Sequence, residues 1–419
     1  MKKYILSLVL ACLLPMGVFA AELPEADPAE VGLSAEKLAE MSAHFQAYVD
    51  DGKLAGLTTL VARKGKVAHF KTYGALDMES GRTLAEDAIF RIYSMTKPVT
   101  GVALMMLYEE GKFELDDPVS KYIPEFADAR VFKAEAEDGT LETEPAARDI
   151  TVRDLMRHTS GLTYGVFGDT PVDKSYLKNQ LIGVDQPMAE WVPRLAEQPL
   201  LYQPGAAWVY SLSVEVQGYL IEVLSGQPFD EFLKERIFDP LEMSDTDFYV
   251  PADKLDRFVG IYELDEEKKL IAARNKLLQD YSINPQFKSG GGGLVSTTAD
   301  YWKFAQMVAN GGTMNGVTYL KPETVAMMSK NQLPEALPGI AGGKRGLGFG
   351  LDFAVVLDPA KFGNTGEVGE FFWGGMANTV FWIDPTHDIV AILMTNILPT
   401  GVYDVRGEMR TYVNDAIVD

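Results

Sequence analysis

Residues 89–111 read IFRIYSMTKPVTGVALMMLYEEG, and a strand-like run meets a helical pattern inside them. The run covers 89–93, and the apolar residues after Pro98 recur at helical spacing until Gly111 can end the helix. Proline is tolerated in a first helical turn, because its missing N–H would have no partner there. We therefore predict a strand that leads into a helix buried in the domain core, with the N-terminus of that helix open to a cleft.

Ser94 and Lys97 lie three residues apart at this junction. Positions i and i+3 share a helix face, so the ammonium of Lys97 should lie beside the hydroxyl of Ser94. A free hydroxyl is a poor nucleophile at neutral pH, and the S-x-x-K spacing supplies the neighbouring cation that it needs without a histidine. The pattern predicts a nucleophilic serine, and the alternative is a serine that only caps the helix.

The same spacing occurs twice more, at Ser34 with Lys37 and at Ser175 with Lys178. Ser34 precedes apolar residues at helical spacing, which predicts a helix N-cap. Ser175 lies in the polar stretch 173–179 with no strand before it, which predicts a surface position. Neither serine is expected to take part in chemistry.

The start of the chain indicates an exported protein, and the net charge bears on its partners. The chain carries 38 basic and 60 acidic residues, a formal net charge of −22, which disfavours nucleic acid as a partner. Residues 1–20 have the layout of a secretory signal, with cleavage expected after Ala20 and release to the periplasm or the exterior. Their apolar run is too short to span a bilayer. Cys12, the only cysteine, lies in this segment, and lipidation there is the less favoured alternative.

Two hairpin patterns lie near opposite ends of the chain. Residues 56–63 and 66–73 form the first, and residues 378–384 and 388–396 form the second, which a helix pattern over 405–417 follows. Both ends are therefore predicted to build one layer of sheet and helices. The predicted fold is α/β, a sandwich whose antiparallel sheet is flanked by N- and C-terminal helices.

The middle of the chain has a different character. Residues 115–285 are richer in helical patterns and in loops such as 135–148, whose acidic, small-residue composition suggests exposure. We predict a mostly helical subdomain, 115–285, inserted between the parts 30–114 and 286–419 of a single domain that spans 21–419.

A serine activated by lysine still needs a proton carrier and donors for the oxyanion. Tyr210 is the candidate carrier, because it follows the Pro-Gly turn at 203–205 and precedes a helix pattern. The alternative is a tyrosine that only packs against the start of that helix. Residues 371–376 read FFWGGM, and their two glycines suit a backbone that approaches a ligand closely, or else a β-bulge.

These three segments resemble, in order and spacing, the motifs of the serine beta-lactamase and penicillin-binding-protein superfamily, and especially its class C-like branch with the family VIII carboxylesterases. The resemblance implies a beta-lactamase-like fold. It implies that Ser94 is the acyl-accepting nucleophile and that Lys97 and Tyr210 are its acid–base pair. The oxyanion hole would be the backbone N–H groups of Ser94 and Met376.

Two departures from the family pattern bear on the substrate. Leu212 stands where the tyrosine motif ends in a polar residue, and Trp373 stands where a lysine would attract a carboxylate. Together with Gly374 and Gly375, they are predicted to line the substrate pocket. Both departures favour a neutral ester, so the predicted function is hydrolysis of short-chain carboxylic esters through an acyl-enzyme on Ser94.

Several alternatives stay open. The chain could be a beta-lactamase or a D-alanyl-D-alanine carboxypeptidase, an acyltransferase, or a catalytically silent peptidoglycan-binding or scaffold protein. The expected partner is a small-molecule ester or amide, and the resemblance implies no cofactor. The four histidines form no metal-spaced pair, so no metal site is expected. His158 is predicted to have a structural role at a helix end.

Overall fold

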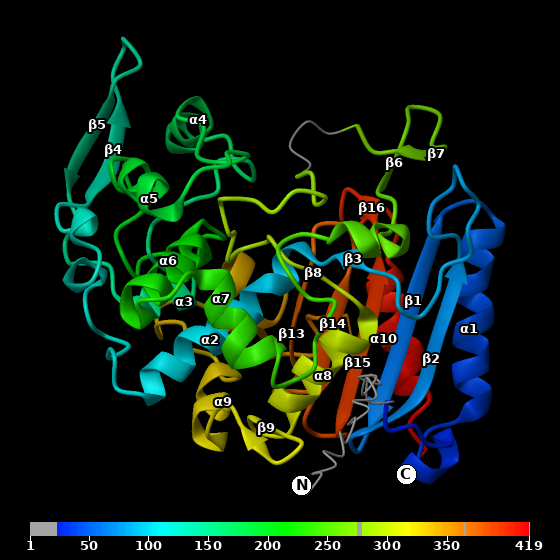
Figure 1. Cartoon of the computed structure of the whole chain (residues 1–419). Coiled ribbons are helices and arrows are strands. Elements are labelled where there is room, and N and C mark those ends of the chain that lie inside the picture. Colours follow the sequence, from blue (N-terminus) through cyan, green and yellow to red (C-terminus); the bar gives the residue numbers. More distant parts are fainter. Residues whose placement is uncertain (1–22, 275–278, 364–365, 419) are drawn as a thin grey trace, which may run out of the picture.

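The computed structural model describes residues 23–274, 279–363 and 366–418, and Figure 1 shows the whole chain. The expected signal segment and Cys12 lie outside the described residues. Within the described ranges, no helix combines the length and the apolar composition needed to cross a bilayer.

A seven-stranded antiparallel sheet joins the two ends of the chain. Its strand order is β11-β12-β13-β14-β15-β1-β2, so the N-terminal hairpin pairs with the C-terminal one through β1 and β15. Both predicted hairpins are confirmed. The strands of this sheet are β1 (Gly56–Arg63), β2 (Lys66–Gly74), β11 (Leu347–Phe349), β12 (Ala354–Val356), β13 (Phe371–Gly374), β14 (Val380–Asp384) and β15 (Ile389–Thr395).

Helices cover both faces of the sheet, because alternate residues of each buried strand point to opposite sides. On β1, Val61 joins the core under α1 (Ala35–Asp50) and α10 (Val405–Asp415), and Leu60 joins the larger core on the other face. That second face carries α8 (Thr298–Ala309), as Figure 1 shows. The predicted α/β sandwich is confirmed.

The central helix α2 (Thr96–Glu109) lies between the sheet and the helices of the middle region (Figure 1). Every residue from Thr96 to Leu107 is buried, which confirms the predicted core helix. The other helices are α3 (Val152–Met156), α4 (Pro171–Lys178), α5 (Met188–Ala196), α6 (Ser213–Ser225), α7 (Phe229–Leu233) and α9 (Pro322–Met328).

Short strands complete the fold. One small sheet joins β6 (Tyr262–Leu264) and β7 (Leu270–Ala272) to β16 (Ile397–Leu398), so part of the predicted helical subdomain pairs with the C-terminal part of the chain. The remaining short strands are β3 (Phe90–Arg91) with β8 (Val295–Ser296), and β9 (Thr313–Met314) with β10 (Val317–Thr318).

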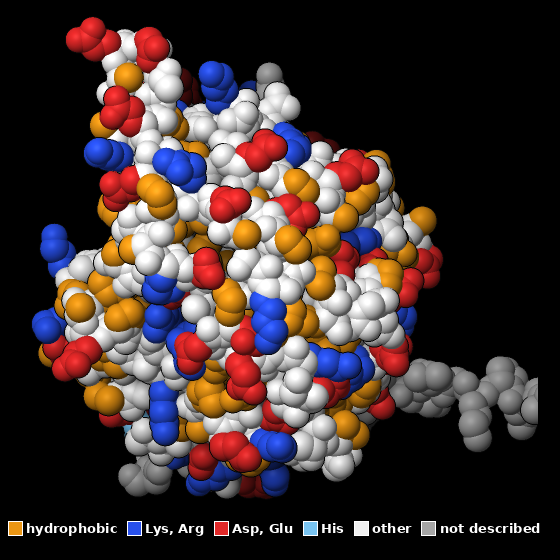
Figure 2. Space-filling model, turned by 90° about the vertical axis from the view of Figure 1, so that its left-hand side faces the viewer, with side chains coloured by type: hydrophobic (Ala, Val, Ile, Leu, Met, Phe, Trp, Pro, Cys, Tyr) orange, Lys and Arg blue, Asp and Glu red, His pale blue; other side chains and the backbone are white. Residues whose placement is uncertain are grey.

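The segment predicted as the loop 135–148 is instead largely a hairpin. Strands β4 (Arg130–Glu135) and β5 (Leu141–Pro145) pair antiparallel and protrude from the molecule, where Figure 2 shows acidic side chains gathered. Gly139 provides the turn, with a positive φ of 82°. The expected exposure is confirmed, but the loop prediction was wrong, because a ribbon solvated on both faces lacks the apolar alternation that reveals a strand.

Candidate active site

A sharp turn places Ser94 at the start of α2. Strand β3 is shorter than the predicted run, and a 3₁₀ turn over Tyr93–Met95 connects it to the helix. Tyr93 has φ 43°, a left-handed conformation that costs a non-glycine residue on the order of 1–3 kcal/mol. This strained residue directly precedes Ser94, so the backbone is bent at the point where the serine enters the cleft.

Lys97 is completely buried, and its ammonium is fully hydrogen-bonded. Its Nζ donates to Ser94 Oγ at 3.2 Å, to the hydroxyl of Tyr164 at 2.9 Å and to the carbonyl oxygen of Gly291 at 2.5 Å. An ammonium has three N–H donors, and each finds an acceptor here. The cation is therefore held against the serine as the i, i+3 spacing predicts.

Tyr210 completes the group around the serine. Its hydroxyl donates to Ser94 Oγ at 2.6 Å, and Lys97 Nζ lies 4.6 Å from the centroid of its ring. A cation at that distance attracts the π-face of the ring. The structure thus brings together the three residues that the sequence proposes for catalysis, and a proton can pass between the two hydroxyls directly.

Tyr164 is a neighbour of Lys97 that sequence reasoning missed. Burial raises the pKa of Tyr164 well above its ordinary value, and Tyr210 and Glu215 raise it further. Tyr164 therefore stays a neutral hydroxyl that accepts a hydrogen bond from Lys97. Its segment carries no catalytic motif, so no local signal could have identified it.

The loop behind Lys97 is held by a buried carboxyl. Glu215 accepts from the backbone N–H of Gly291 at 2.9 Å and from Ser289 Oγ at 2.9 Å. Burial raises the pKa of Glu215, while Lys97 and these hydrogen bonds lower it in part. The four consecutive glycines 290–293 thus form a turn before β8. The carbonyl oxygen of Gly291 in this turn accepts from Lys97.

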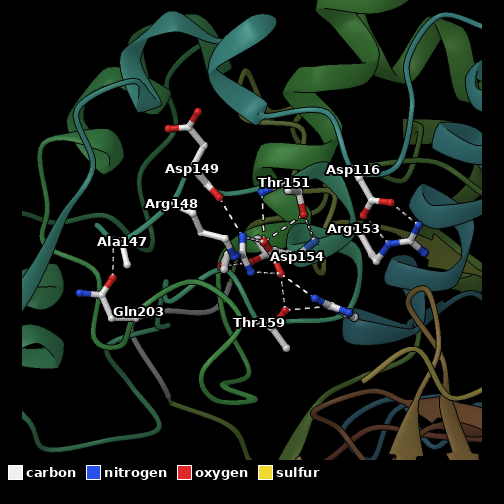
Figure 3. Close-up of polar contacts among 12 residues, drawn as sticks. Asp116, Ala147, Arg148, Asp149, Thr151, Arg153, Asp154, Thr159 and Gln203 are labelled. Atoms are coloured by element: carbon white, nitrogen blue, oxygen red, sulfur yellow. Dashed lines mark hydrogen bonds and ion pairs between the residues drawn. The ribbon is translucent and has the colours of Figure 1, made fainter. Parts of the chain in front are cut away.

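Asp154 anchors the segment that carries Tyr210. This fully buried carboxylate accepts from Arg148, Arg157 and Thr159, among the contacts drawn in Figure 3. Burial raises its pKa, but these hydrogen bonds outweigh burial and hold it below its ordinary value. Thr159, which Asp154 holds, also accepts at its carbonyl oxygen from the N–H of Gly205 at 2.7 Å. Asp154 and its partners therefore fix the turn that precedes Tyr210.

His158 lies beside Tyr210 in this scaffold. The two rings are 5.0 Å apart, and His158 Nδ1 lies 3.0 Å from Ser211 Oγ. Burial, and then the charge of Lys97, lowers the pKa of His158 well below its ordinary value. The imidazole is therefore neutral, and it supports Tyr210 from a position just after α3, at a helix end as predicted.

The two proposed oxyanion donors come from the start of α2 and from the turn after β13. Met376 follows β13 in a turn, and a Cβ added to the preceding Gly375 would lie closer than 3.0 Å to the carbonyl oxygen of Ile92. Glycine is therefore needed for β13 to approach the strand before Ser94 so closely. Among the described residues, no hydrogen-bond acceptor is found for the backbone N–H of Met376, so this group can donate to a ligand.

Two cavities meet at Ser94. One has a volume of about 850 Å³ and the other about 560 Å³, and the residues common to both linings are Ser94, Phe167, Tyr210 and Met376. Trp373, Gly374 and Gly375 line the larger cavity, and Leu212 lines the smaller one. The arrangement gives a substrate room on both sides of the atom that the serine attacks. Further apolar residues of the smaller cavity are Val166, Leu181, Ile182, Val184, Tyr281, Ile283, Pro285 and Phe287.

The described residues offer no ready metal site. Across the three described ranges, no group of three or more His, Cys, Asp or Glu side chains is placed to hold a metal ion. The site chemistry available from these residues is that of a hydroxyl nucleophile, a buried ammonium and a phenol.

Comparisons with known proteins identify relatives of the whole chain. Protein Rv1367c of Mycobacterium tuberculosis (strain ATCC 25618 / H37Rv) is 36% identical over 367 residues, covering 85% of this chain and 89% of that protein. Esterase EstB of Burkholderia gladioli is 29% identical over 93% of this chain and 98% of its own length. The solved structure of EstCE1, described as a hydrolase with promiscuous acyltransferase activity, has a TM-score of 0.77 at 25% identity, covering 90% of this chain and 98% of that one.

The family is shown by a match over most of the chain. The family model described as Beta-lactamase matches residues 41–412, which include the serine, tyrosine and glycine segments of the site. The chain is therefore a serine hydrolase that belongs to the beta-lactamase family.

Proposed function

We propose that this protein is a carboxylesterase that cleaves neutral carboxylic esters through an acyl-enzyme on Ser94. The observation that carries the proposal is the pair of contacts on Ser94 Oγ, 2.6 Å from the hydroxyl of Tyr210 and 3.2 Å from Lys97 Nζ, where two cavities meet. The similarity to the esterase EstB and to the hydrolase EstCE1 supports it.

Acylation starts once Tyr210 has released its hydroxyl proton to solvent, and Ser94 then passes its own proton to the Tyr210 oxygen beside the ammonium of Lys97. Ser94 Oγ then attacks the ester carbonyl carbon, and the oxygen of that carbonyl takes up the negative charge between the N–H groups of Ser94 and Met376. When the tetrahedral intermediate collapses, Tyr210 returns the proton to the departing alkoxide, which leaves as an alcohol.

Deacylation reverses these roles. A water molecule gives a proton to Tyr210 as its oxygen attacks the acyl carbon, and the same two N–H groups hold the second oxyanion. Ser94 Oγ leaves with the proton from Tyr210, the carboxylic acid is released, and the site returns to its starting state.

Two positions in the cavity walls support a neutral substrate, although Arg345 and Arg406 also line the larger cavity. Trp373 lines the larger cavity where the family pattern has a cation, and Leu212 lines the smaller cavity with an apolar side chain. An anionic group loses a charge-assisted contact at the first position, whereas an apolar group gains buried area at both. Preference for a short acyl chain stays a prediction from the sequence.

Rates on a series of p-nitrophenyl esters, from acetate through butyrate and octanoate to dodecanoate, test this proposal when nitrocefin is assayed with the same preparation. We expect fastest turnover on the short esters, and no turnover of any ester in Ser94→Ala. Faster turnover of nitrocefin than of every ester would instead make the protein a beta-lactamase. Absence of turnover together with absence of labelling by a fluorophosphonate probe would make it catalytically silent.

Transfer of the acyl group to an alcohol is a second candidate function. The observation that favours it is the second cavity, because an acyl group can stay in one cavity while an alcohol enters the other. Product analysis with added butanol tests this candidate. Formation of the butyl ester at the expense of free acid supports transfer, and free acid alone supports hydrolysis.

A further inference from the structure

We propose that Arg406, in the first turn of α10, is a positioning residue for the oxyanion hole. It acts on the peptide that joins Gly375 to Met376, whose N–H is one of the two proposed donors. The inference rests on the proposed function, because it concerns how that N–H is aimed at the reacting oxygen.

The guanidinium of Arg406 holds the turn between β13 and β14. Its Nη2 donates to the carbonyl oxygen of Gly375 at 2.5 Å and to that of Thr379 at 2.8 Å. Its Nε lies 3.5 Å from the carbonyl oxygen of Asn378. One side chain thus contacts three carbonyl oxygens of the five-residue turn that carries Met376.

The contact with Gly375 bears directly on the oxyanion donor. The carbonyl group of Gly375 and the N–H of Met376 belong to one planar peptide unit, so fixing the oxygen also fixes the direction of the N–H. A charged donor on the oxygen draws electron density from the peptide and makes its N–H a stronger donor. Arg406 therefore both aims and polarises the group that would hold the oxyanion.

The surroundings of Arg406 favour this role over a purely structural one. Among the described residues, Arg406 has no ion pair with a carboxylate, and its hydrogen bonds go only to backbone oxygens of this turn. Burial, and then the charge of Arg410, lowers the pKa of Arg406 to about 10, so it stays charged at neutral pH. A largely buried cation without a carboxylate partner is costly for a protein to keep.

The position of Arg406 also complements the glycine motif. A Cβ on Gly374 would lie 2.9 Å from the Arg406 Cζ atom, so the guanidinium is stacked closely against this part of β13. Trp373 supplies no charge on the cavity side of the motif. Arg406 adds a positive charge behind the Gly375 peptide, separate from that of Lys97 beside Ser94. From the other side, Thr400 Oγ1 contacts the carbonyl oxygen of Met376.

Two substitutions of Arg406 test the inference, with steady-state kinetics on p-nitrophenyl butyrate and the rate of inactivation by a fluorophosphonate. Arg406→Met keeps the length of the side chain but removes the charge and the donors, and Arg406→Lys keeps the charge without the paired donors. We expect kcat to fall about 10²-fold in Arg406→Met and about 10-fold in Arg406→Lys, with KM within about 3-fold of the wild type. Fluorophosphonate inactivation should slow in the same order, because its tetrahedral adduct uses the same N–H donors.

Arg63→Met is the matched control. Arg63 is buried and likewise donates to two backbone oxygens, those of Gly32 and His387, but it lies at the opposite end of the sheet strands. This variant should lower the melting temperature without changing kcat. Circular dichroism of every variant separates loss of fold from loss of rate.

Three outcomes would overturn the inference. If Arg406→Met keeps kcat within about 3-fold of the wild type, or if only KM rises, Arg406 does not position the oxyanion donor. An equal loss of kcat in Arg63→Met would mean that general destabilisation explains the effect. If the wild type itself cleaves no ester and takes no fluorophosphonate at Ser94, the proposed function fails first and the role of Arg406 with it.

Discussion

Replacing Tyr164 by phenylalanine should separate the lysine from one of its three acceptors while leaving Ser94 and Tyr210 in place. The hydrogen bond that disappears joins a buried ammonium to a hydroxyl over 2.9 Å. The loss of a hydrogen bond to a charged group costs about 1.5–3 kcal/mol of unfolding free energy, because the freed N–H belongs to a completely buried side chain. For a chain of this size, we expect the melting temperature to fall by about 2–4 °C.

The same change should slow catalysis moderately. Lys97 keeps its contacts with Ser94 Oγ and with the carbonyl oxygen of Gly291, so the cation stays near the nucleophile but is less firmly oriented. If the variant loses about 1.4 kcal/mol of transition-state stabilisation, kcat falls about tenfold. Tyr210→Phe removes the proton carrier itself and should cost about 10²–10⁴-fold.

Tyr319→Phe provides the control for removing a buried tyrosine hydroxyl. Among the described residues, the hydroxyl of Tyr319 is buried without a hydrogen-bond partner, so its loss should leave the rate unchanged and should not lower the melting temperature. Thermal melts and kcat on p-nitrophenyl butyrate are measured for all three variants. The reasoning is refuted if Tyr164→Phe matches the wild type in both measurements, or if it loses as much activity as Tyr210→Phe, since Tyr164 would then carry the proton itself.

Three further outcomes follow from the structure. Gly375→Ala places a methyl group closer than 3.0 Å to the carbonyl oxygen of Ile92, so we expect kcat to fall about 10²-fold, and an unchanged kcat would contradict the close approach. Ser34→Ala removes the cap that accepts from the N–H of Lys37 at 3.3 Å, so unfolding should cost about 1 kcal/mol less by urea titration, with ester turnover unchanged. Burial lowers the pKa of His69 from 6.5 to about 4, so its contribution to stability is complete above pH 6.5 and falls by up to about 3 kcal/mol as the pH drops toward 4. Melting temperatures recorded over that range should fall less steeply in His69→Gln, and parallel curves would rule out this assignment.

The parts of the site that sequence could predict are those set by local geometry. Ser94 and Lys97 are three residues apart on one helix face, and the flanking strand and helix patterns separate them from the capping serine at Ser34, which the structure shows to be an N-cap. Ser175 is half-buried rather than fully on the surface, because its polar segment forms the short helix α4 around a buried Tyr176 and its hydroxyl donates to Gln198.

The parts that sequence missed depend on contacts between distant segments. Tyr164 and Arg406 lie in stretches without a motif, and each becomes significant only through a partner far away in the chain, Lys97 for one and the turn after β13 for the other. Helical spacing and turn residues report on neighbours within a few positions. No such pattern records which remote carbonyl oxygen or ammonium a tyrosine or an arginine will meet.

The three acceptors of Lys97 link the proposed catalytic site to the assembly of the fold. They come from positions 3, 67 and 194 residues away along the chain, in the serine turn, the middle region and the glycine turn. When the segment of Tyr164 or of Gly291 is undocked, Lys97 is open to water and its ammonium is no longer held against Ser94. Docking of the middle region against the sheet therefore also assembles the contacts that hold Lys97 beside Ser94. In a refolding experiment, ester cleavage should therefore return only when the middle region has docked on the sheet. A partly assembled form should cleave no ester.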